Sequence, residues 1–490
     1  MNLDISNVRG LPQAELDILN ELLTVWRNKQ DKNKKRIEYY EMKNRVKDLG
    51  IAIPEPLKRM SLVVGWPAKA VDCLAIRSRF DGFTFSDNND HGLKDLLDAN
   101  QFKLLYRQGV TDELINSCAF LTVSKGGTNE PDVVLNVYSA VDAAGLWDRR
   151  RKRIRAGLTI VDTKPTYEGS DEEEPVWVNL YTDTDVWEIK KDGNGWTSRR
   201  NPHKMGRPLI EPMAYKANTT YRPFGRSRIT RSVRCITDAA LRANLREEVA
   251  AEFATAIQKY ILGVEDDFFE NNDKLEAYIG NVLALTPNND GEIPRVGQFS
   301  QTGTQPQIES IRTLAARFAG ETSIPVTELG IIHDNPASYE ALITMYSSLI
   351  TECEDLNERN GESLKVVGKM MLAIANDTSY WNLGEVERSI VCEWKDPSLM
   401  NSNARMDMTA KMNAIWPWMA ESEESLVMAG IPEDKRVKLM SDKAAFEAKQ
   451  AVLQMREQMQ GDRTLANGPV RARAGVSDTA GKEPVARVSV

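Results

Sequence analysis

Residues 224–263 read FGRSRITRSVRCITDAALRANLREEVAAEFATAIQKYILG and contain the start, body and end signals of one long helix. Gly225 can reverse the chain, Ser227 is the expected N-cap, and Gly263 follows a strand-like triplet that ends the helix. About thirty residues at ~1.5 Å each give a rod of roughly 45 Å. Apolar residues recur along it in two stripes at helical spacing, so the rod needs packing partners along its length. The stripes are Ile229, Val233, Ile236, Ala240 and Ala243, and Leu241, Leu245, Val249, Phe253 and Ile257.

Composition describes a folded, acidic chain. With 490 residues, of which 41% are hydrophobic, the length predicts two to four domains with real cores. A net charge of −8 argues against tight non-specific binding of nucleic acid, which depends on cations that neutralise phosphates. The five cysteines form no CxxC pair and there are three histidines, which excludes zinc-type ligand sets and fits a reducing compartment. No apolar run reaches about eighteen residues and the amino terminus has no signal-peptide core, so we expect neither secretion nor a membrane span.

The amino-terminal region has helical spacing of apolar residues. Residues 12–49 predict two helices, separated by the polar run 27–36, which we interpret as a solvated helix face rather than a nucleic-acid patch because acidic residues interrupt it. Gly65-Trp66-Pro67 starts a third helix, and a further one is expected over residues 93–107.

Residues 119–212 have the sequence pattern typical of β-strands. Apolar and polar residues alternate in AFLTVS, DVVLNVYS, RIRAGLTIVD, PVWVNLYT and DVWEIKK, with turn residues between them, which predicts one antiparallel sheet. Residues 149–155, RRRKRIR, are the most basic run of the chain, and we call them the basic run. A solvated strand entrance explains them more simply than a contact with DNA or an ion pair between subunits.

The second half of the chain is expected to be mostly helical. Residues 260–307 are strand-like and rich in turns, which predicts a small α/β insertion, and a helix follows at 308–318. Asn335 is a good N-cap and Pro336 a good first residue for a second long helix that reaches about residue 375. A strand at 387–394, helices at 401–418 and 431–460, and a disordered tail from Gly461 complete the prediction. The apolar stripe of the second long helix is Leu342, Met345, Leu349, Cys353, Leu356, Leu364, Val367, Met371 and Ile374.

Catalytic signatures are missing from the sequence. There is no phosphate-binding GxxxxGK[ST] loop, no HExxH pair and no GxSxG elbow, so we expect no catalytic residues, no metal and no cofactor. His333 and Asp334 belong to an HDNP turn before a helix, which explains them better than an acid–base pair does. The acidic residues 171–174 fit a charged hairpin loop, and Trp177 and Trp187 fit core packing.

Several blocks, taken in order, carry a family resemblance. Tyr39-Tyr40 followed by LGIAIP, then VGWPAKAVDCLAIRSRFDGF, the whole of 224–263, VTELGIIHDNPASYEAL, and EWKDP before a helix containing Lys411 cover most of the chain. In these blocks the sequence resembles the portal, or head-to-tail connector, proteins of tailed siphophages, particularly the group common in phages of Gram-positive hosts. It departs from the family at Glu41-Met42, where a glycine is often found, and at AIQKYILG, where a proline often precedes the aromatic residue.

The resemblance implies an α+β portal-type fold with long helices, an antiparallel wing sheet, stem helices, a small α/β clip and a helical crown, assembled as a ring. One subunit is not expected to bury the apolar stripes of two long helices by itself, whereas a closed ring supplies neighbours on both flanks. By order of elements, the regions would be the wing (1–228), a long helix entering the stem (229–259), the clip (260–307), a second stem helix (308–327), a channel loop (328–335), a long wing helix with a return strand (336–400), the crown helices (401–460) and the disordered tail (461–490).

Two sets of site residues follow from this order. In the channel loop, apolar residues flank a glycine, two acidic residues would repel phosphates, and one histidine could gain charge near neutral pH. The alternative is an ordinary buried connection between helices. The loop comprises Glu328, Leu329, Gly330, Ile331, Ile332, His333, Asp334 and Asn335. In the clip, the apolar residues are too sparse to form a core alone, so neighbouring copies are expected to share them: Ile261, Leu262, Val282, Leu283 and Leu285.

The function implied by the resemblance is a non-enzymatic portal at the unique capsid vertex, through which DNA is packaged and ejected. Its partners would be eleven further copies in a twelve-membered ring, double-stranded DNA in the channel, the terminase large subunit, major capsid and scaffold proteins, and a neck or adaptor protein, with no membrane. It would reside in the virion, and in the host cytoplasm during assembly. The alternatives are a scaffold or minor capsid protein without a channel, and an enzyme such as a nuclease or nucleotidyltransferase, which would need a set of metal-binding carboxylates.

Overall fold

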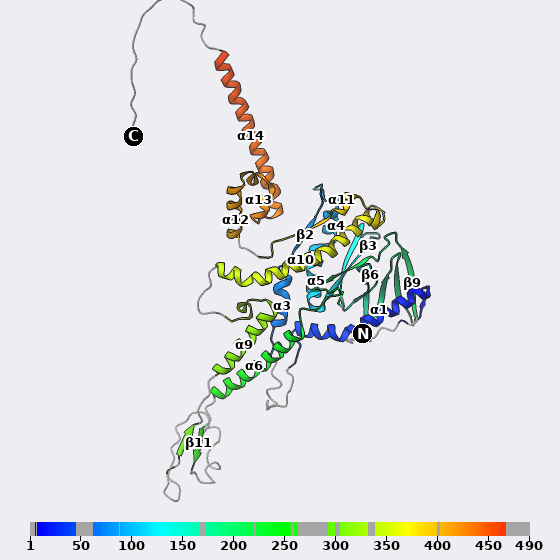
Figure 1. The fold of residues 1–490 in the computed structure, drawn as a ribbon, viewed down its shortest axis with the longest axis vertical. Coiled ribbons are helices and arrows are strands. Elements are labelled where there is room, and N and C mark those ends of the chain that lie inside the picture. The colour runs from blue at the N-terminus through cyan, green and yellow to red at the C-terminus, as the bar shows by residue number, and fades with distance from the viewer. Residues whose placement is uncertain are drawn as a thin grey trace, which may run out of the picture. The chain divides into compact units, whose positions relative to one another are not determined.

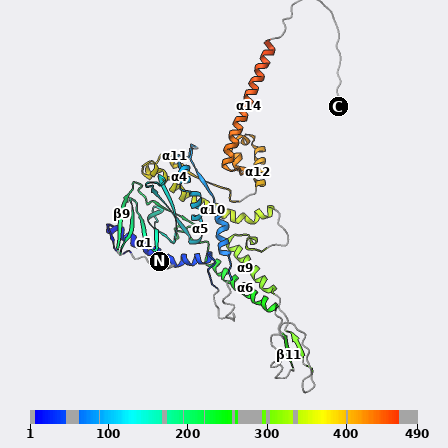
Figure 2. The same cartoon turned by 180° about the vertical axis from the view of Figure 1, so that it is seen from behind.

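The structure is a computed structural model with two compact units, Met1–Leu399 and Met400–Val490. Helices and strands are mixed throughout the first unit, and the second is helical (Figures 1 and 2), so the predicted α+β class is confirmed. The described residues are 5, 7–45, 62–87, 89–166, 173–193, 195–219, 222–255, 259–262, 293, 295–298, 304–331, 339–398 and 402–466.

The amino-terminal helix α1 is continuous from Gln13–Tyr40, so the prediction of two helices is wrong. The polar run in its middle is not simply a solvated face, because Gln30 and Asn33 are buried. Their side-chain amides donate hydrogen bonds to the backbone carbonyls of Val141 and Ala140, at 2.8 and 3.1 Å. Both bonds satisfy carbonyls in the turn after strand β4. Buried polar residues therefore hold the middle of the helix against the rest of the chain, at positions where no apolar stripe is present.

The predicted single sheet is two sheets. The first has six strands in the order β1-β9-β8-β7-β6-β5, all antiparallel except for β1, which runs parallel to β9. The second has the order β10-β3-β4 and is antiparallel. Strand β3 contacts both α5 and α10, and residues 118–123 are all buried, so both faces of this strand are covered. The strands are β1 Val8–Arg9, β3 Cys118–Lys125, β4 Val133–Ser139, β5 Ala143–Asp148, β6 Arg153–Pro165, β7 Glu173–Tyr181, β8 Asp185–Asp192, β9 Gly195–Pro202 and β10 Ile210–Ala214.

The predicted helix over residues 93–107 is broken into α4, Leu93–Ala99, and α5, Phe102–Asn116. Asn100 causes the break, because its side chain donates to the carbonyl of Val133 and accepts from the amide of Leu135, both at 2.8 Å. A polar side chain that forms hydrogen bonds with strand β4 in this way fixes a turn. The spacing of apolar residues alone predicts that the helix continues through this position. Helix α3, Trp66–Ala75, begins as predicted.

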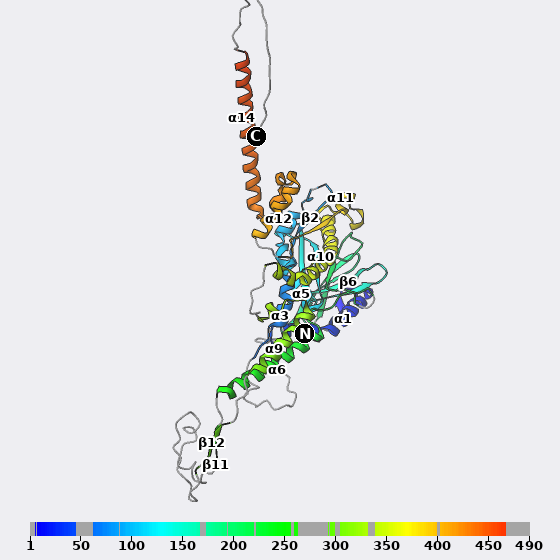
Figure 3. The same cartoon turned by 60° about the vertical axis from the view of Figure 1, so that its left-hand side comes forward.

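The long helix of residues 224–263 is α6, Arg231–Thr255, and it lies beside α9, Gln305–Thr322 (Figures 1 and 3). The predicted cap is wrong: the hydroxyl of Thr230 accepts from the amide of Val233 at 3.2 Å. Ser227 instead accepts from the amide of Ile229 at 2.9 Å, within the turn before the helix. Beyond α6, strand β11, Lys259–Leu262, pairs antiparallel with β12, Arg295–Gln298.

The second long helix is α10, Tyr339–Ala375, with 37 residues. The predicted cap residues, Asn335 and Pro336, lie outside the described residues. From Leu349 to Met371 its apolar stripe is buried within this chain, where α10 contacts β3 and β10, so the expectation that the stripe needs a neighbouring copy is wrong for this part, whereas Met345 is 40% exposed. The buried stripe residues are Leu349, Cys353, Leu356, Leu364, Val367 and Met371.

The predicted strand over residues 387–394 begins late. Its first residues form helix α11, Glu385–Arg388, in which the carboxylate of Glu387 accepts the amide of Gly384 at 2.7 Å. Strand β13, Val391–Trp394, follows and pairs with β2, Phe80–Thr84.

The second unit contains four helical segments among its described residues: α12 Ser402–Ile415, η3 Pro417–Glu421, α13 Glu423–Met428 and α14 Glu433–Ala466. Helix α14 continues past Gly461, so the first six residues of the predicted tail are helical, and residues 467–490 lie outside the described part. An isolated glycine costs a helix only about 1 kcal/mol, which a helix of 34 residues tolerates. None of the described helices combines the length and the apolar character that crossing a membrane requires.

Candidate functional site

The connection between α9 and α10 contains the described half of the predicted channel loop. Ser323 ends α9 with a left-handed backbone, and the short 3₁₀ helix η1, Val326–Leu329, leads to Gly330 at φ +83°. A Cβ atom at Gly330 would have open space around it, so the glycine is required by its backbone angle and not by crowding. Ile331 is half-buried. Ile332, His333, Asp334 and Asn335 lie outside the described residues.

Glu328 fastens this connection to the body of the subunit. Its carboxylate lies 2.6 Å from the ammonium group of Lys69 on α3 and accepts a 2.5 Å hydrogen bond from the hydroxyl of Tyr346 on α10. Burial opposes ionisation of Glu328, but these two partners lower the pKa of the carboxyl below its usual value. Burial and the bond to Glu328 raise the pKa of Tyr346 to about 12. The carboxylate therefore carries its charge at neutral pH, and Lys69 compensates it.

Leu329, next to Glu328, packs against the main hydrophobic core. Of the four described loop residues, Glu328 and Leu329 are thus attached to the body of the subunit. These contacts fix the position of the first residues of the loop.

A buried ionic cluster lies where α3, α6, α9 and α10 come together. We call Tyr215, Lys216, Arg228 and Glu352 the anchor cluster. The guanidinium of Arg228 is 4% exposed and lies 2.7 Å from the carboxylate of Glu352 on α10. Lys216 lies 2.5 Å from the same carboxylate, and the hydroxyl of Tyr215 donates to it.

Arg228 also bonds the backbone of two further helices. It donates to the carbonyl of Ala70 on α3 and to that of Thr322 at the end of α9, each at 2.6 Å. It therefore satisfies a carbonyl at the carboxyl end of α9 and links three helices three residues before α6 begins. The cluster fixes how the α6–α9 pair leaves the rest of the subunit.

The charges of the cluster stabilise one another. Burial alone would raise the pKa of Glu352, but the charge of Arg228 and the hydrogen bond from Lys216 lower it to about 2. Burial opposes the charge of Arg228, yet Tyr215 and Glu352 raise its pKa above the usual value. A buried charge pair is costly to break from one side.

The residues predicted to form the clip are only partly described. Ile261 pairs with Val296 across the two-stranded β11–β12 ladder, and Leu262 is 58% exposed. Val282, Leu283 and Leu285 lie outside the described residues.

Three of the six cations in the basic run pair with carboxylates of the same chain. Arg151 and Arg153 lie 3.5 and 3.3 Å from Asp183, and Arg155 lies 2.5 Å from Glu21. Arg151 and Arg155 are exposed, as a solvated strand entrance requires, but the side chain of Arg153 is only 13% exposed, so that prediction does not hold for Arg153. Among the described residues, no group of three or more histidine, cysteine or acidic side chains is placed to hold a metal ion.

Sequence reasoning missed the anchor cluster. Arg228 lies in the block FGRSRIT, but nothing in its spacing shows that it meets Glu352, which is 124 positions away in the sequence. The available signal was an arginine and a glutamate among the apolar residues of two long helical blocks, because such residues are rarely buried without partners.

Known proteins support the resemblance. Residues 19–417 match the family model described as "Phage portal protein, SPP1 Gp6-like". The chain is 25% identical over 397 residues to the portal protein of Mycobacterium phage L5. The aligned region covers 76% of this chain and 77% of the phage protein. It is 23% identical over 420 residues to the portal protein of Mycobacterium phage D29, with 80% and 81% covered.

Solved structures that match part of this chain come from gene transfer agent (GTA) particles. A chain from the neck of the empty particle matches with a TM-score of 0.43 at 15% identity, over 75% of this chain and 90% of that chain. A chain from the virion of the native particle matches with a TM-score of 0.41 at 14% identity, over the same shares. These low scores add nothing to the assignment, which depends on the family match across 399 residues, 19 to 417. The chain belongs to the SPP1 Gp6-like family of phage portal proteins.

Proposed function

We propose that this portal-family chain assembles as a ring of twelve copies at one capsid vertex and conducts double-stranded DNA during packaging and ejection. The observation that carries the proposal is the family match over residues 19–417, which includes both long helices and the connection before α10. In a closed ring each copy meets a neighbour on both flanks through two different faces.

The regions of the fold take their roles from their order in the chain. Helices α6 and α9 form the stem, and the β11–β12 pair belongs to the clip, where the terminase large subunit docks. The six-stranded sheet and α1 form the wing, and α12 to α14 form the crown. The anchor cluster supports this division, because it joins the base of the stem helices to α3 and α10.

The channel loop begins at Glu328 and runs through residues 332–335. Its support in the structure is that Glu328 and Leu329 are attached to the body of the subunit and that Gly330, with φ +83°, turns the chain directly after them. Twelve copies with net charge −8 carry roughly −96, so DNA phosphates are repelled and the duplex slides. In this role the protein acts without catalysis. The neck protein, the major capsid protein and the scaffold bind its outer surfaces in the virion and, during assembly, in the host cytoplasm.

Electron microscopy of the purified protein tests the ring. Twelvefold rings with an open centre are expected, and particles without a central channel, as for a scaffold or minor capsid protein, would contradict the proposal. Metal-dependent nuclease or nucleotidyltransferase turnover by the purified protein would contradict the non-enzymatic role.

A pair of substitutions tests the channel loop. Ile331→Asp should leave subunit folding and rings intact while DNA packaging or retention fails, since the side chain lies beyond the anchored part of the loop. Leu329→Asp is the matched control and should lower the melting temperature, because it places a charge against the core. An Ile331→Asp protein that misfolds would show an ordinary buried connection, and normal packaging would deny the loop a role.

A further inference from the structure

The second unit has no apolar core of its own among the residues that the structure describes. Its described side chains are those of residues 403–432 and 435–455, and of these only Thr409 and Ser425 are buried. Both are polar. Small units that cannot bury apolar surface by themselves usually depend on association with a partner.

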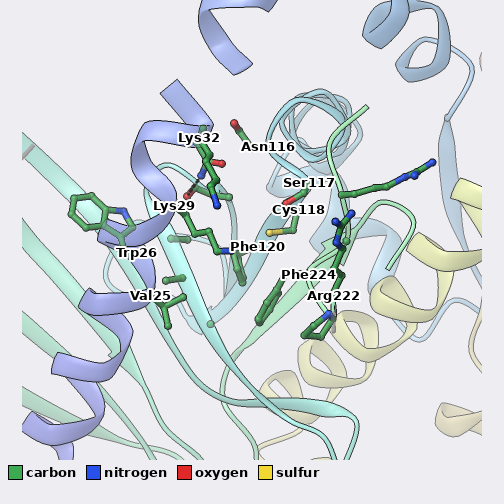
Figure 4. Close-up of a pocket in the computed structure, with 18 of the residues that line it drawn as sticks. Val25, Trp26, Lys29, Lys32, Asn116, Ser117, Cys118, Phe120, Arg222 and Phe224 are labelled. Carbon is green, nitrogen blue, oxygen red and sulfur yellow. Dashed lines mark hydrogen bonds between the residues drawn. The ribbon is translucent and has the colours of Figure 1, made fainter. Parts of the chain in front are cut away.

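The first unit buries its apolar side chains even where it is hollow. Figure 4 shows the cavity between α1 and residues 222–226, with Trp26 and Phe120 on its walls. Both side chains are nevertheless buried, at 1% and 2% exposure. The exposure of apolar side chains is therefore a property of the second unit, and its longest helix shows what could cover them.

Helix α14 carries two apolar stripes on opposite faces. We call Leu439, Phe446 and Leu453 the large stripe, because these residues follow one another at intervals of seven and are 43%, 62% and 51% exposed. At about 100° per residue, the second stripe points about 170° away from the first. We call it the alanine stripe, and it comprises Val437, Ala444, Ala448, Ala451 and Met455, all exposed. A repeat of seven residues is typical of helices that pack along one another, so α14 needs two helical partners.

The two stripes complement each other in size and in height along the helix. Phe446 lies between Ala444 and Ala448 in the sequence, and Leu453 stands in the same relation to Ala451 one repeat later. When a second α14 lies parallel to the first and at the same height, each large side chain meets a gap that alanine leaves. A rotation about a ring axis parallel to the helix produces this arrangement, because rotation keeps the height of every residue.

Charge does not oppose contact between copies of α14. Residues 433–466 contain seven basic and six acidic residues, a net charge of +1, whereas the whole chain carries −8. Repulsion between neighbouring copies is therefore small at this helix. Residues 467–490 supply little cover instead, because their large apolar residues are five valines.

We propose that the large stripe of each α14 packs into the alanine stripe of α14 in the adjacent copy of this chain. The proposal rests on the ring of the proposed function, in which every copy meets its two neighbours through two different faces. A twofold dimer would use one stripe twice and leave the other exposed, whereas a ring covers both. The contact supplies the second unit with the apolar core that a single chain lacks.

Disulfide crosslinking between the two stripes tests this. The full-length variant Phe446→Cys/Ala448→Cys is made with Cys235→Ser, because Cys235 is an exposed free cysteine. After mild oxidation of its rings, denaturing gels should show a ladder of linked chains up to the whole ring. The two positions point about 160° apart on one helix, so they cannot join within a chain.

Two controls accompany the crosslinking. Phe446→Cys/Lys449→Cys should give no ladder, because Lys449 lies outside both stripes. Phe446→Cys alone should stay monomeric, and abundant dimers from it would overturn the proposal, since the large stripe would then pair with itself. Rings of the double variant without a ladder would also overturn it while the portal assignment stands. If the wild-type protein forms no rings, the proposed function falls with it.

Maleimide labelling gives a second arm that keeps the large stripe intact. In rings, the thiol of Ala448→Cys should lose most of its reactivity, because Phe446 of the neighbour covers it, whereas that of Lys449→Cys should remain reactive. Equal reactivity of the two thiols in rings would contradict the proposal. Protection of Ala448→Cys that appears only after a scaffold or capsid protein is added would contradict it as well, since another protein would then cover the stripe.

Discussion

Replacing Glu352 by glutamine removes one charge from the anchor cluster and keeps the shape of the side chain. Arg228 would retain its bonds to the carbonyls of Ala70 and Thr322, but its buried charge would lose the carboxylate 2.7 Å away. Lowering a carboxyl pKa from 4.5 to about 2 corresponds to about 3 kcal/mol, since each pH unit contributes about 1.4 kcal/mol. This agrees with the cost of about 3–5 kcal/mol for breaking a buried ion pair from one side.

The expected change in melting temperature follows from the size of the unit. Unfolding entropy is about 2 cal/mol/K per residue, so 3 kcal/mol spread over the 399 residues of the first unit lowers the Tm by about 4 °C. Calorimetry at neutral pH measures this. The matched control is Glu358→Gln on the same helix, whose exposed side chain should change the free energy of unfolding by less than about 0.5 kcal/mol.

The pH dependence has a definite sign. Because the folded-state pKa of Glu352 lies below its unfolded value, its contribution is fully present above pH 4.5 and is lost as the pH falls toward 2. The gap in Tm between wild type and Glu352→Gln should therefore be constant from pH 7 to pH 5 and should narrow below pH 4.5. Equal melting temperatures for Glu352→Gln and Glu358→Gln at pH 7 would refute the reasoning.

Three further outcomes are expected. Gly225→Ala should lower the Tm more than Gly330→Ala, because both glycines have a positive φ, which costs a residue with a side chain about 1–2 kcal/mol, but only at Gly225 would a Cβ atom also meet backbone oxygens, the nearest at 2.2 Å. Equal losses of Tm in the two variants would contradict the crowding at Gly225. Burial raises the pKa of Glu113 to about 8, so the wild-type protein loses stability as the pH rises from 4.5 toward 8. Glu113→Gln should have the same Tm as wild type at pH 5 and a higher Tm at pH 9, and Tm profiles that stay parallel across this range would contradict a protonated carboxyl group. Removing residues 467–490 should leave Tm and rings unchanged because few apolar residues there could offset ordering entropy, and a fall of several degrees would show that the tail packs.

Periodicity in the sequence predicted the elements whose signals are local. The helix that became α6, the second long helix and most strands of the wing were recognised from apolar spacing and turn residues, since side-chain direction repeats every 3.6 residues in a helix and every two in a strand. The family blocks added the predicted order of regions and the proposed position of the channel loop, neither of which can be derived from the spacing of apolar residues. Strand β9 was missed, because its sequence GWTSRRNP has no alternation of apolar residues.

The tertiary structure decided everything that depends on distant polar partners. The turn carbonyls at Val141 and Ala140 make α1 one helix, and strand β4 makes Asn100 end α4, in both cases because a buried polar group must find its bond wherever the fold supplies it. The partition of the strands into two sheets depends on helices that cover both faces of β3. The anchor cluster joins Arg228 to Glu352 across 124 positions, and no local pattern encodes such a pairing, because its free energy exists only once four helices exclude water around it.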